Sequence, residues 1–284
     1  MKLNYLLEKE NILIAPGIFD GLSAHMAEQA GANLVYLSGA SLAYTRFGLP
    51  DIGLISMSEV SETISVIRDR INLPIIVDAD NGFGNALNVQ RTVKNFERMG
   101  ANAIQIEDQI SPKRCGHLKD KKLIECTEMV GKIKAACDAR RCAETLIVAR
   151  TDAIAVEGFE SAIDRSHKYI KAGADILFIE APTSKDQMKK ITSIFRKEVP
   201  LMANMVEGGM SPLLNANELE KIGYKVVIFP GGLVRAIAKL SKNYFSNLLL
   251  NGSNLNFLDS MYKLDHLNQI LNTEKILNKG KQYE

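Results

Sequence analysis

The sequence contains only four cysteines among its 284 residues. A disulfide framework is not expected in a chain this long with so few cysteines. The four residues, Cys115, Cys126, Cys137 and Cys142, form neither C-x-x-C pairs nor a Cys/His pattern typical of zinc. We therefore expect the last three to be buried thiols and treat Cys115 separately below.

The sequence also lacks long apolar runs and an excess of charge of one sign. Its longest apolar runs have about six to eight residues, whereas roughly 20 are needed to span a bilayer. The net charge is +2, and the basic residues are scattered rather than gathered into a nucleic-acid-binding stripe. Residues 1–10 hold four charged side chains and do not read as a signal peptide. We expect a cytoplasmic protein without membrane or nucleic-acid partners.

The composition is that of a globular enzyme-sized protein. Hydrophobic residues make up 46% and charged residues 24% of the chain, which suits one large buried core. The length allows either one large α/β barrel or two ordinary domains. Because no Pro/Ser-rich linker interrupts the sequence, we expect a single domain over 1–284.

A short unit recurs four times: a helical segment ends in glycine, and an apolar run follows. The glycines are Gly31, Gly100, Gly173 and Gly223, and each run ends seven positions later. Glycine suits the left-handed conformation at a helix C-terminus. The runs are rich in Val and Ile without alternation, as expected for strands that are buried on both faces.

Eight apolar runs are predicted to be strands. They are 11–16, 33–38, 74–79, 103–107, 145–150, 175–180, 201–205 and 225–230. Amphipathic helical segments follow most of them, such as 88–99, 128–139 and 159–172. This alternation predicts an α/β protein with a closed (β/α)8 TIM-type barrel rather than an open sheet.

Two further features bear on the fold. No Gly-x-Gly-x-x-Gly motif follows the first strand, which argues against a dinucleotide-binding domain. The tail, 251–284, lies beyond the eighth unit and reads as helical over 257–271. We expect this tail to pack on the barrel or on a neighbouring subunit.

Polar and ionisable residues stand where the predicted strands end. They are Ser38, Gly39, Asp78, Asp80, Glu107, Asp108, Arg150, Thr151, Asp152, Glu180 and Asn204. Active sites of such barrels form at the C-terminal ends of the strands. Buried ionisable groups are costly unless they are paired or coordinated. We therefore expect these side chains to lie close together at the end of the barrel where the strands' C-terminal ends meet, here called the mouth.

Three of these residues predict a metal site. Asp78 and Asp80 share one face of an extended segment, and Glu107 ends the next strand. An oxygen-only set suits Mg²⁺ or Mn²⁺ rather than zinc. The alternative is that these carboxylates cap helices or pair with Arg91 and Arg150.

The segment Lys113–His117 follows the Glu107 strand and contains Cys115 between basic residues. Such neighbours should lower the pKa of the thiol, so that it exchanges a proton near neutral pH. A covalent nucleophile and a solvated basic loop are the alternatives. Gly82, Gly84 and Gly116 give these loops the freedom of a lid.

Several short motifs together resemble the isocitrate lyase/phosphoenolpyruvate mutase superfamily. They are Tyr36–Gly39, Gly48–Asp51, Val77–Asp80 with Gly82–Gly84, Ile106–Gln109, Lys113–His117 and Ala149–Asp152. The resemblance runs from Ile14 to about Arg235. The Lys113–His117 motif resembles the lyase branch that cleaves 2-methylisocitrate or 2,3-dimethylmalate, whereas the phosphomutases carry a loop without this cysteine.

The resemblance implies a barrel whose C-terminal helix is exchanged between subunits of a homotetramer, built as a dimer of dimers. It implies Mg²⁺-dependent cleavage of a 2-hydroxy di- or tricarboxylate to pyruvate, or another 2-oxo acid, and a carboxylic acid. Asp80 would bind the metal directly, while Asp78 and Glu107 would act mostly through bound waters.

The resemblance also implies roles for the remaining residues. Ser38, Gly39 and Ala40 would bind the 2-oxo acid carboxylate, and Arg150 would hold the same end of the substrate. Cys115 would protonate the departing carbanion. The pocket would be completed by Tyr36, Asp51, Lys113, Gly116, His117, Glu180 and Asn204, with Tyr36, Lys113 and His117 counted as catalytic.

The segment Asn204–Gly209, followed by Ser211-Pro212, departs from the pattern of methylisocitrate lyases. It is more similar to alkylmalate lyases and plant oxaloacetate-cleaving relatives, and phosphonate mutases share it. Oxaloacetate hydrolysis or decarboxylation, a phosphonate-forming mutase and a non-catalytic barrel therefore remain alternatives. The Lys113–His117 motif argues against the mutase.

Overall fold

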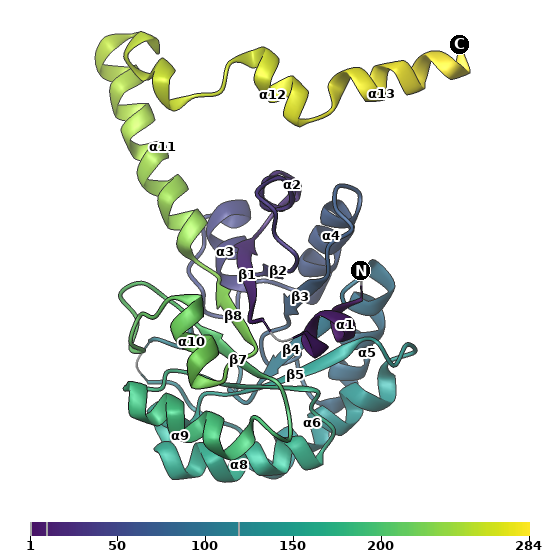
Figure 1. Cartoon of the computed structure of the whole chain (residues 1–284), viewed down its shortest axis with the longest axis vertical. Helices are drawn as coiled ribbons and strands as arrows, with labels where there is room; N and C mark the ends of the chain where they lie inside the picture. Colours follow the sequence, from purple (N-terminus) through teal and green to yellow (C-terminus); the bar gives the residue numbers. More distant parts are fainter. Residues whose placement is uncertain (1, 10, 119) are drawn as a thin grey trace. The chain divides into compact units, whose positions relative to one another are not determined.

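The computed structural model describes residues 2–9, 11–118 and 120–284. The chain divides into two compact units, and the boundary falls between Val234 and Arg235. In the first unit, eight parallel strands pair in sequence order and the eighth pairs with the first, so the sheet closes into a barrel (Figure 1). The predicted (β/α)8 barrel is confirmed.

All eight predicted strands are present, and their ends lie within two residues of the predicted ones. They are β1 Leu13–Ile18, β2 Val35–Leu37, β3 Ile75–Asp78, β4 Ala103–Glu107, β5 Leu146–Thr151, β6 Ile176–Ile179, β7 Leu201–Asn204 and β8 Val226–Phe229. The register sets Asp78 beside Gln105 and Glu107 beside Arg150. Residues of neighbouring strand ends are therefore brought together by backbone pairing.

Helices connect the strands. They are α1 Leu3–Glu8, α2 Gly21–Gln29, α3 Gly39–Leu42, the π-helix η1 Ala43–Phe47, α4 Met57–Arg68, α5 Ala86–Met99, α6 Cys126–Ala139, α7 Ala153–Val156, α8 Phe159–Lys171, α9 Lys185–Phe195, α10 Ala216–Ile222 and α11 Gly232–Asn251. Gly100 and Gly223 cap α5 and α10 with φ of 102° and 115°. The predicted left-handed glycines are confirmed, since Gly31 and Gly173 also have positive φ.

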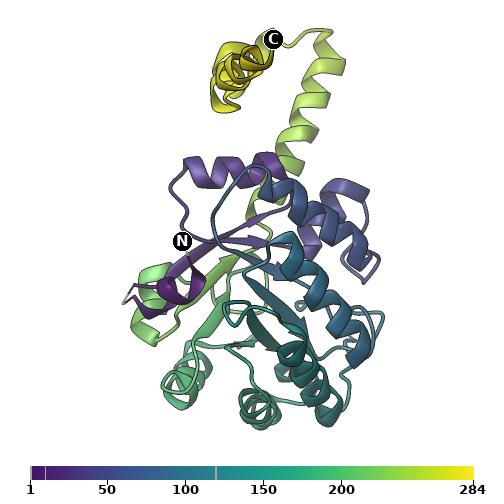
Figure 2. The same ribbon diagram turned by 90° about the vertical axis from the view of Figure 1, so that its right-hand side faces the viewer.

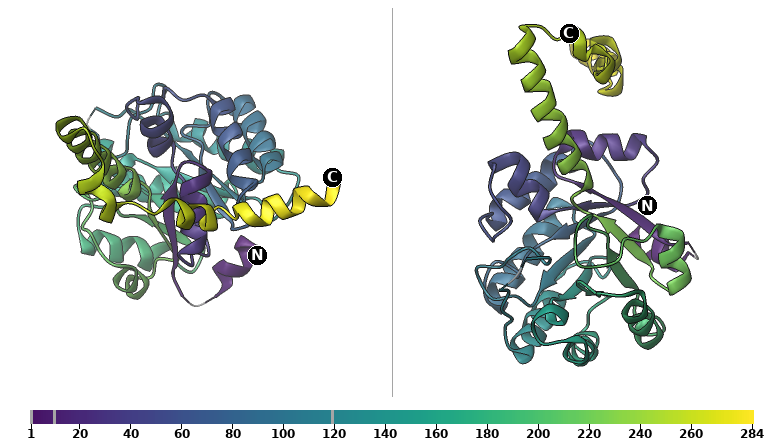
Figure 3. Two further views of the ribbon diagram at one scale, coloured as in Figure 1. Left: turned by 90° about the horizontal axis from the view of Figure 1, so that it is seen from above. Right: turned by 90° about the vertical axis from the view of Figure 1, so that its left-hand side faces the viewer.

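The first unit has an outer and an inner core. On the outside, helices pack against the strands (Figures 2 and 3); α5, for example, buries Val89, Val93 and Phe96 completely. Inside, apolar side chains of the strands pack with Leu3 and Leu6 of α1. Helix α1 therefore closes the end of the barrel opposite to the strands' C-terminal ends.

The second unit contains the rest of α11, η2 Leu255–Ser260, α12 Leu264–Ile270, α13 Thr273–Gly280 and η3 Lys281–Tyr283. Helical structure over much of 257–271 was expected and is present. The unit begins inside α11 rather than at 251. Among the described residues, none of the helices combines the length and apolar character that crossing a membrane requires.

All four cysteines are free, in agreement with the absence of a disulfide framework. The expected burial of three thiols is wrong for Cys142, which is exposed, and Cys126 and Cys137 are only partly buried. Cys142 lies in the turn between α6 and β5, where its N–H donates to Glu97 at the surface. Because this turn lies at the surface, Cys142 is not packed into a hydrophobic core.

Candidate active site

Asp78 is fixed at the end of β3 by N–H donors. Its Oδ1 accepts from the Asp80 amide at 3.1 Å and from Gln105 Nε2 at 3.3 Å, and its Oδ2 accepts from the Gly39 amide at 3.3 Å. The Tyr36 hydroxyl, inside the barrel, donates to Gln105 Oε1 at 3.0 Å. Two hydrogen bonds in series, from Tyr36 to Gln105 and from Gln105 to Asp78, therefore orient Asp78 from inside the barrel.

Asp80 follows two residues later with a left-handed φ of 47°. Its Oδ1 lies 2.7 Å from Lys113 Nζ but has no partner with hydrogen-bond geometry among the described residues. Burial raises the pKa of Asp80 to about 6, an effect that Lys113 opposes and Asp78 and Asp51 reinforce. Asp80 thus presents a buried oxygen whose strongest contact is a cation.

Glu107 ends β4 and completes the acidic side of the mouth. Its Oε2 lies 3.3 Å from Arg150 Nη1, so the alternative pairing with Arg150 is real for this residue. Its Oε1 has no hydrogen-bond partner in the described chain. Burial raises the pKa of Glu107 well above its usual range, and Arg150 opposes the shift.

The acidic residues fit one kind of metal ion. The described residues contain no group of three His, Cys, Asp or Glu side chains placed to hold an ion directly. Glu107 Oε1 is nevertheless a buried oxygen without a hydrogen-bond partner in the described chain, and Asp80 Oδ1 is a buried oxygen whose near contact is the Lys113 ammonium. This pattern suits a hard cation that keeps several waters, as Mg²⁺ does, with Asp80 as the residue able to bind it directly.

Arg150 faces these carboxylates from β5. Its guanidinium donates to Asp152 through Nε at 2.9 Å and Nη2 at 3.1 Å, and Nη2 lies 3.3 Å from Glu180 Oε2. It also lies over the Phe178 ring, 5.1 Å from the centroid. These contacts with Asp152, Glu180 and Phe178 hold the guanidinium in one orientation, in which it faces the mouth.

Glu180, Asn204 and His117 form the part of the wall next to Arg150. Asn204 Nδ2 donates to Glu180 Oε2 at 2.9 Å, and Glu180 Oε1 lies 3.7 Å from His117 Nε2. His117 Nδ1 accepts from the Met210 amide, and burial lowers the pKa of His117. Asn204 Oδ1 and His117 Nε2 lack hydrogen-bond partners within the described residues, so this wall offers both an acceptor and a donor.

The loop between Gln109 and Leu123, here named the Cys115 loop, reaches the site. Lys113 Nζ contacts Asp51 Oδ1 at 2.5 Å, and the Cys115 amide donates to the Asp51 carbonyl at 3.2 Å. Gly116 packs directly on the arginine: a Cβ placed there would lie 2.4 Å from Arg150 Nη2. The loop therefore lies against the mouth.

The predicted low pKa of the Cys115 thiol is wrong. Burial, reinforced by the Asp51 carboxylate, raises the pKa of Cys115 to about 11. The basic neighbours do not prevent this because Lys113 is engaged by Asp51 and Asp80. Cys115 is consequently a thiol at neutral pH, a state suited to giving a proton rather than to nucleophilic attack.

Ser38 and Gly39 lie at the end of β2. The Ser38 side chain accepts from the Ser41 amide and caps α3, and its own amide donates to the Ile18 carbonyl. A Cβ at Gly39 would lie 3.2 Å from Asp78 Oδ2 and 3.4 Å from Asp80 Oδ1. A ligand carboxylate here would meet two carboxylates, so its binding requires a cation between them.

Sequence reasoning missed two supporting residues, Gln105 and Lys121, and it named Asp108 only as one of the polar residues at the strand ends. Gln105 is a lone polar residue within an apolar strand, which is a readable signal. Asp108, fully buried, accepts from the Thr151 hydroxyl and the Tyr169 hydroxyl. Lys121, in the Cys115 loop, has no such signal because its surroundings are defined only by the folded loop.

The fold and this site define a (β/α)8-barrel enzyme whose mouth is built for a small polar ligand. Residues 3–249 match the family model described as phosphoenolpyruvate phosphomutase, and the chain belongs to this family. The predicted resemblance is thereby confirmed.

Two of the curated relatives are named as carbon–carbon lyases. The chain is 46% identical over 260 residues to the 2-methylisocitrate lyase of Aeropyrum pernix, covering 92% of this chain and 83% of the relative. It is 38% identical over 277 residues to the 2,3-dimethylmalate lyase of Eubacterium barkeri, covering 97% and 94%.

Solved structures show the same fold. An oxaloacetate acetylhydrolase bound to 3,3-difluorooxalacetate has a TM-score of 0.94 at 30% identity, covering 99% of this chain and 96% of that one. A 2,3-dimethylmalate lyase has a TM-score of 0.92 at 31% identity, covering 99% and 93%. A phosphonopyruvate hydrolase complexed with oxalate and Mg²⁺ has a TM-score of 0.89 at 28% identity, covering 99% and 97%.

Proposed function

We propose that this chain is a Mg²⁺-dependent carbon–carbon lyase, with Mn²⁺ as a possible substitute. Its substrate would be a 2-hydroxy di- or tricarboxylate of the 2,3-dimethylmalate or 2-methylisocitrate type. The observation that carries the proposal is a set of four buried polar atoms without hydrogen-bond partners: Asp80 Oδ1, Glu107 Oε1, His117 Nε2 and Asn204 Oδ1. Buried polar atoms rarely stay unpaired, so these atoms fit a polar ligand bound at the mouth.

The residues divide the work of binding. Ser38, Gly39 and Ala40 and the Arg150 guanidinium bind the carboxylate that becomes part of the 2-oxo acid. Asp80, together with Asp78 and Glu107, would hold the cation. When bound, Mg²⁺ supplies Lewis-acid polarisation of the substrate's 2-hydroxyl and carboxylate.

The reaction consists of a cleavage and a protonation. The 2-hydroxyl passes its proton to a water molecule, the C2 ketone forms as the C2–C3 bond breaks, and the electron pair of that bond passes to an enediolate of the departing acid. Lys113 and Arg150 place positive charge near this developing anion. Cys115 protonates it, and its raised pKa keeps that proton available at neutral pH.

Oxaloacetate hydrolysis is a second candidate function. It is favoured by the high structural similarity to an oxaloacetate acetylhydrolase and by the Asn204–Gly209 segment. On this chain both reactions would take place at the same mouth, so substrate size would decide between them.

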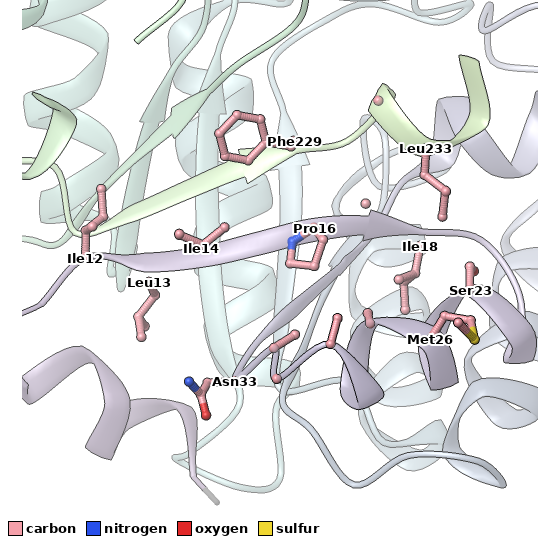
Figure 4. A pocket seen from close by; sticks show the side chains of 16 residues that line it. Ile12, Leu13, Ile14, Pro16, Ile18, Ser23, Met26, Asn33, Phe229 and Leu233 are labelled. Carbon is pink, nitrogen blue, oxygen red and sulfur yellow. The ribbon is translucent and has the colours of Figure 1, made fainter. Parts of the chain in front are cut away.

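The proposal includes a homo-oligomer, built as a dimer of dimers in the cytoplasm. An apolar groove of about 610 Å³ lies beside β1 and α2 (Figure 4), where Ile14 and Leu233 are 50% and 43% exposed. The second unit separately exposes Leu249 and Leu250, at 83% and 85%. Such apolar surfaces mark protein interfaces, and we assign the groove to the C-terminal helices of a second copy.

Product analysis by proton NMR tests the function. Purified protein with Mg²⁺ is given 2-methylisocitrate, 2,3-dimethylmalate, isocitrate, oxaloacetate and phosphoenolpyruvate in turn. Pyruvate with succinate or with propionate, lost with EDTA and in Cys115→Ser, supports the lyase and names its branch. Oxalate with acetate from oxaloacetate alone would replace it with the hydrolase, and light scattering measures the oligomer.

A further inference from the structure

Two buried side chains hold the Cys115 loop on either side of the cysteine. Gln109 donates to the Arg114 carbonyl at 2.8 Å and accepts from the Arg114 amide at 2.9 Å. Lys121 Nζ donates to the Gly116 carbonyl. Both supports come from the base of the loop, where Gln109 forms an antiparallel bridge with Leu123. The thiol-bearing residue is thus bracketed by contacts to its two neighbours.

Lys121 is the unusual member of this pair. Its side chain is only 1% exposed, although a lysine ammonium normally stays in water. Besides the Gly116 carbonyl, it contacts Asp152 Oδ1 at 2.8 Å. A buried ammonium is costly unless it is paired and hydrogen-bonded, and the closed loop supplies one of its partners. If the loop opens, Lys121 loses the Gly116 carbonyl.

Asp152 connects this contact with the arginine. The same carboxylate that pairs with Lys121 receives both hydrogen bonds of the Arg150 guanidinium, at 2.9 and 3.1 Å. Two cations favour its charged form, and they hold the pKa of Asp152 at about 2 despite burial. Gly116 meanwhile packs against Arg150 with no room for a Cβ. The loop position and the guanidinium orientation therefore depend on one buried anion.

We propose that Lys121 is a positioning residue that ties the closed Cys115 loop to Arg150 through Asp152. The assignment rests on the proposed function in its kinetic consequence, but its structural content does not. A ligand held by Arg150 and the closed position of Cys115 favour one another, because both require the same arrangement of Asp152. The residue that delivers the proton is then brought into place when the substrate's carboxylate is bound.

The first test measures how often the loop exposes Cys115. Wild-type protein, Lys121→Met and Lys121→Arg are treated with iodoacetamide at pH 8, and alkylation of the Cys115 peptide is followed by mass spectrometry. Lys122→Met is the matched control, because it removes the same charge one residue away at an exposed position. We expect Cys115 of Lys121→Met to react at least about tenfold faster, with Lys121→Arg and Lys122→Met within about threefold of wild type.

The second test separates positioning from binding. In Lys121→Met, kcat should fall about 100-fold while KM changes by less than about threefold, because a displaced catalytic group costs rate rather than affinity. Lys121→Arg should recover most of the loss.

The alkylation test and the kinetic test can fail independently of each other. Alkylation needs no substrate, so it judges the loop anchor even if none of the tested acids is cleaved. Wild-type alkylation rates in folded Lys121→Met, checked by circular dichroism, would overturn the proposal. If this variant does not fold, Lys121→Gln, which keeps an amide donor without the charge, is measured in its place, and unchanged alkylation there has the same meaning.

Discussion

The strand ends and the Cys115 loop meet at one mouth but are held in different ways. Glu107 and Arg150 sit side by side because their strands pair at that register, and the same is true of Asp78 and Gln105. Residues 110–118 and 120–122 lie outside the strands, and their position depends on side chains such as Lys121. Groups on rigid strands keep their geometry in every state, whereas a loop held by a few contacts can open.

The difference indicates a division of labour. In the proposed mechanism, the strand ends would hold what must be present before reaction, namely the cation ligands and the arginine. The loop would carry the acid, which is needed only after the bond has broken. Changes at the strand ends should therefore alter binding, while changes in the loop should alter turnover with binding retained.

The largest effect is expected at Cys115. Replacing Cys115 with Ser should lower kcat by about 10³-fold or more, because a hydroxyl is a far weaker acid than a thiol. Titration calorimetry with Mn²⁺ should give an unchanged affinity. A loss of metal binding in this variant would contradict the separation of loop and strand ends.

A strand-end variant should show the reverse pattern. Asp80→Asn should weaken Mn²⁺ binding by more than about 100-fold, because it removes the charge of the residue best placed to bind the cation. Iodoacetamide should still alkylate Cys115 at the wild-type rate. Faster alkylation in Asp80→Asn would mean that the metal side also holds the loop, through Lys113.

Gly116→Ala tests the contact between the two regions. The added methyl group would overlap Arg150 Nη2 and lie 2.8 Å from Glu180 Oε2, so the loop could not take its closed position. We expect kcat to fall about 100-fold with a thermal unfolding midpoint close to that of wild type. A large drop in this midpoint would instead assign Gly116 to the stability of the barrel.

Gln105→Leu should have a smaller effect, because Gln105 lies inside the barrel and contacts the site through Asp78. The variant leaves the Tyr36 hydroxyl without its partner and removes one of the two donors to Asp78 Oδ1, which costs about 1–3 kcal/mol of unfolding free energy. Metal affinity should fall about tenfold, as for other residues that orient a ligand. Denaturant unfolding and calorimetry measure the two effects, and a stable variant with normal affinity would remove Gln105 from the site.

The smallest expected effect is the dependence of the rate of Cys115 alkylation on pH. Because burial raises the pKa of Cys115 to about 11, its alkylation should rise steadily between pH 8 and pH 10 without levelling off. Cys142, which is exposed, serves as the internal comparison in the same digest. A plateau for Cys115 below pH 8 would restore the original expectation of an acidic thiol.

The strand ends were also the part that the sequence predicts well. Val- and Ile-rich runs that lead to Asp78, Glu107 and Arg150 recur between helical segments, which predicts strands, and the pairing of these strands brings the three residues together. The state of Cys115 was predicted wrongly because neighbours in sequence were taken as its electrostatic surroundings. In the fold, Lys113 turns to Asp51 and Asp80, and burial decides the pKa.

Lys121 and Asp152 illustrate the same limit. Asp152 could be flagged as an ionisable residue after a strand, but its link to the loop depends on tertiary contacts 31 residues apart in the chain. Local patterns carry no information on which lysine of a basic loop is buried. Only the folded arrangement separates Lys121 from the exposed Lys122.

The position of helix α1 limits where substrates and products can enter and leave the enzyme. Leu3 and Leu6, both 2% exposed, fill the end of the barrel away from the catalytic groups. A molecule at the mouth thus has no exit through the barrel's interior. The substrate and both products of the proposed reaction would therefore have to enter and leave at the same end of the barrel.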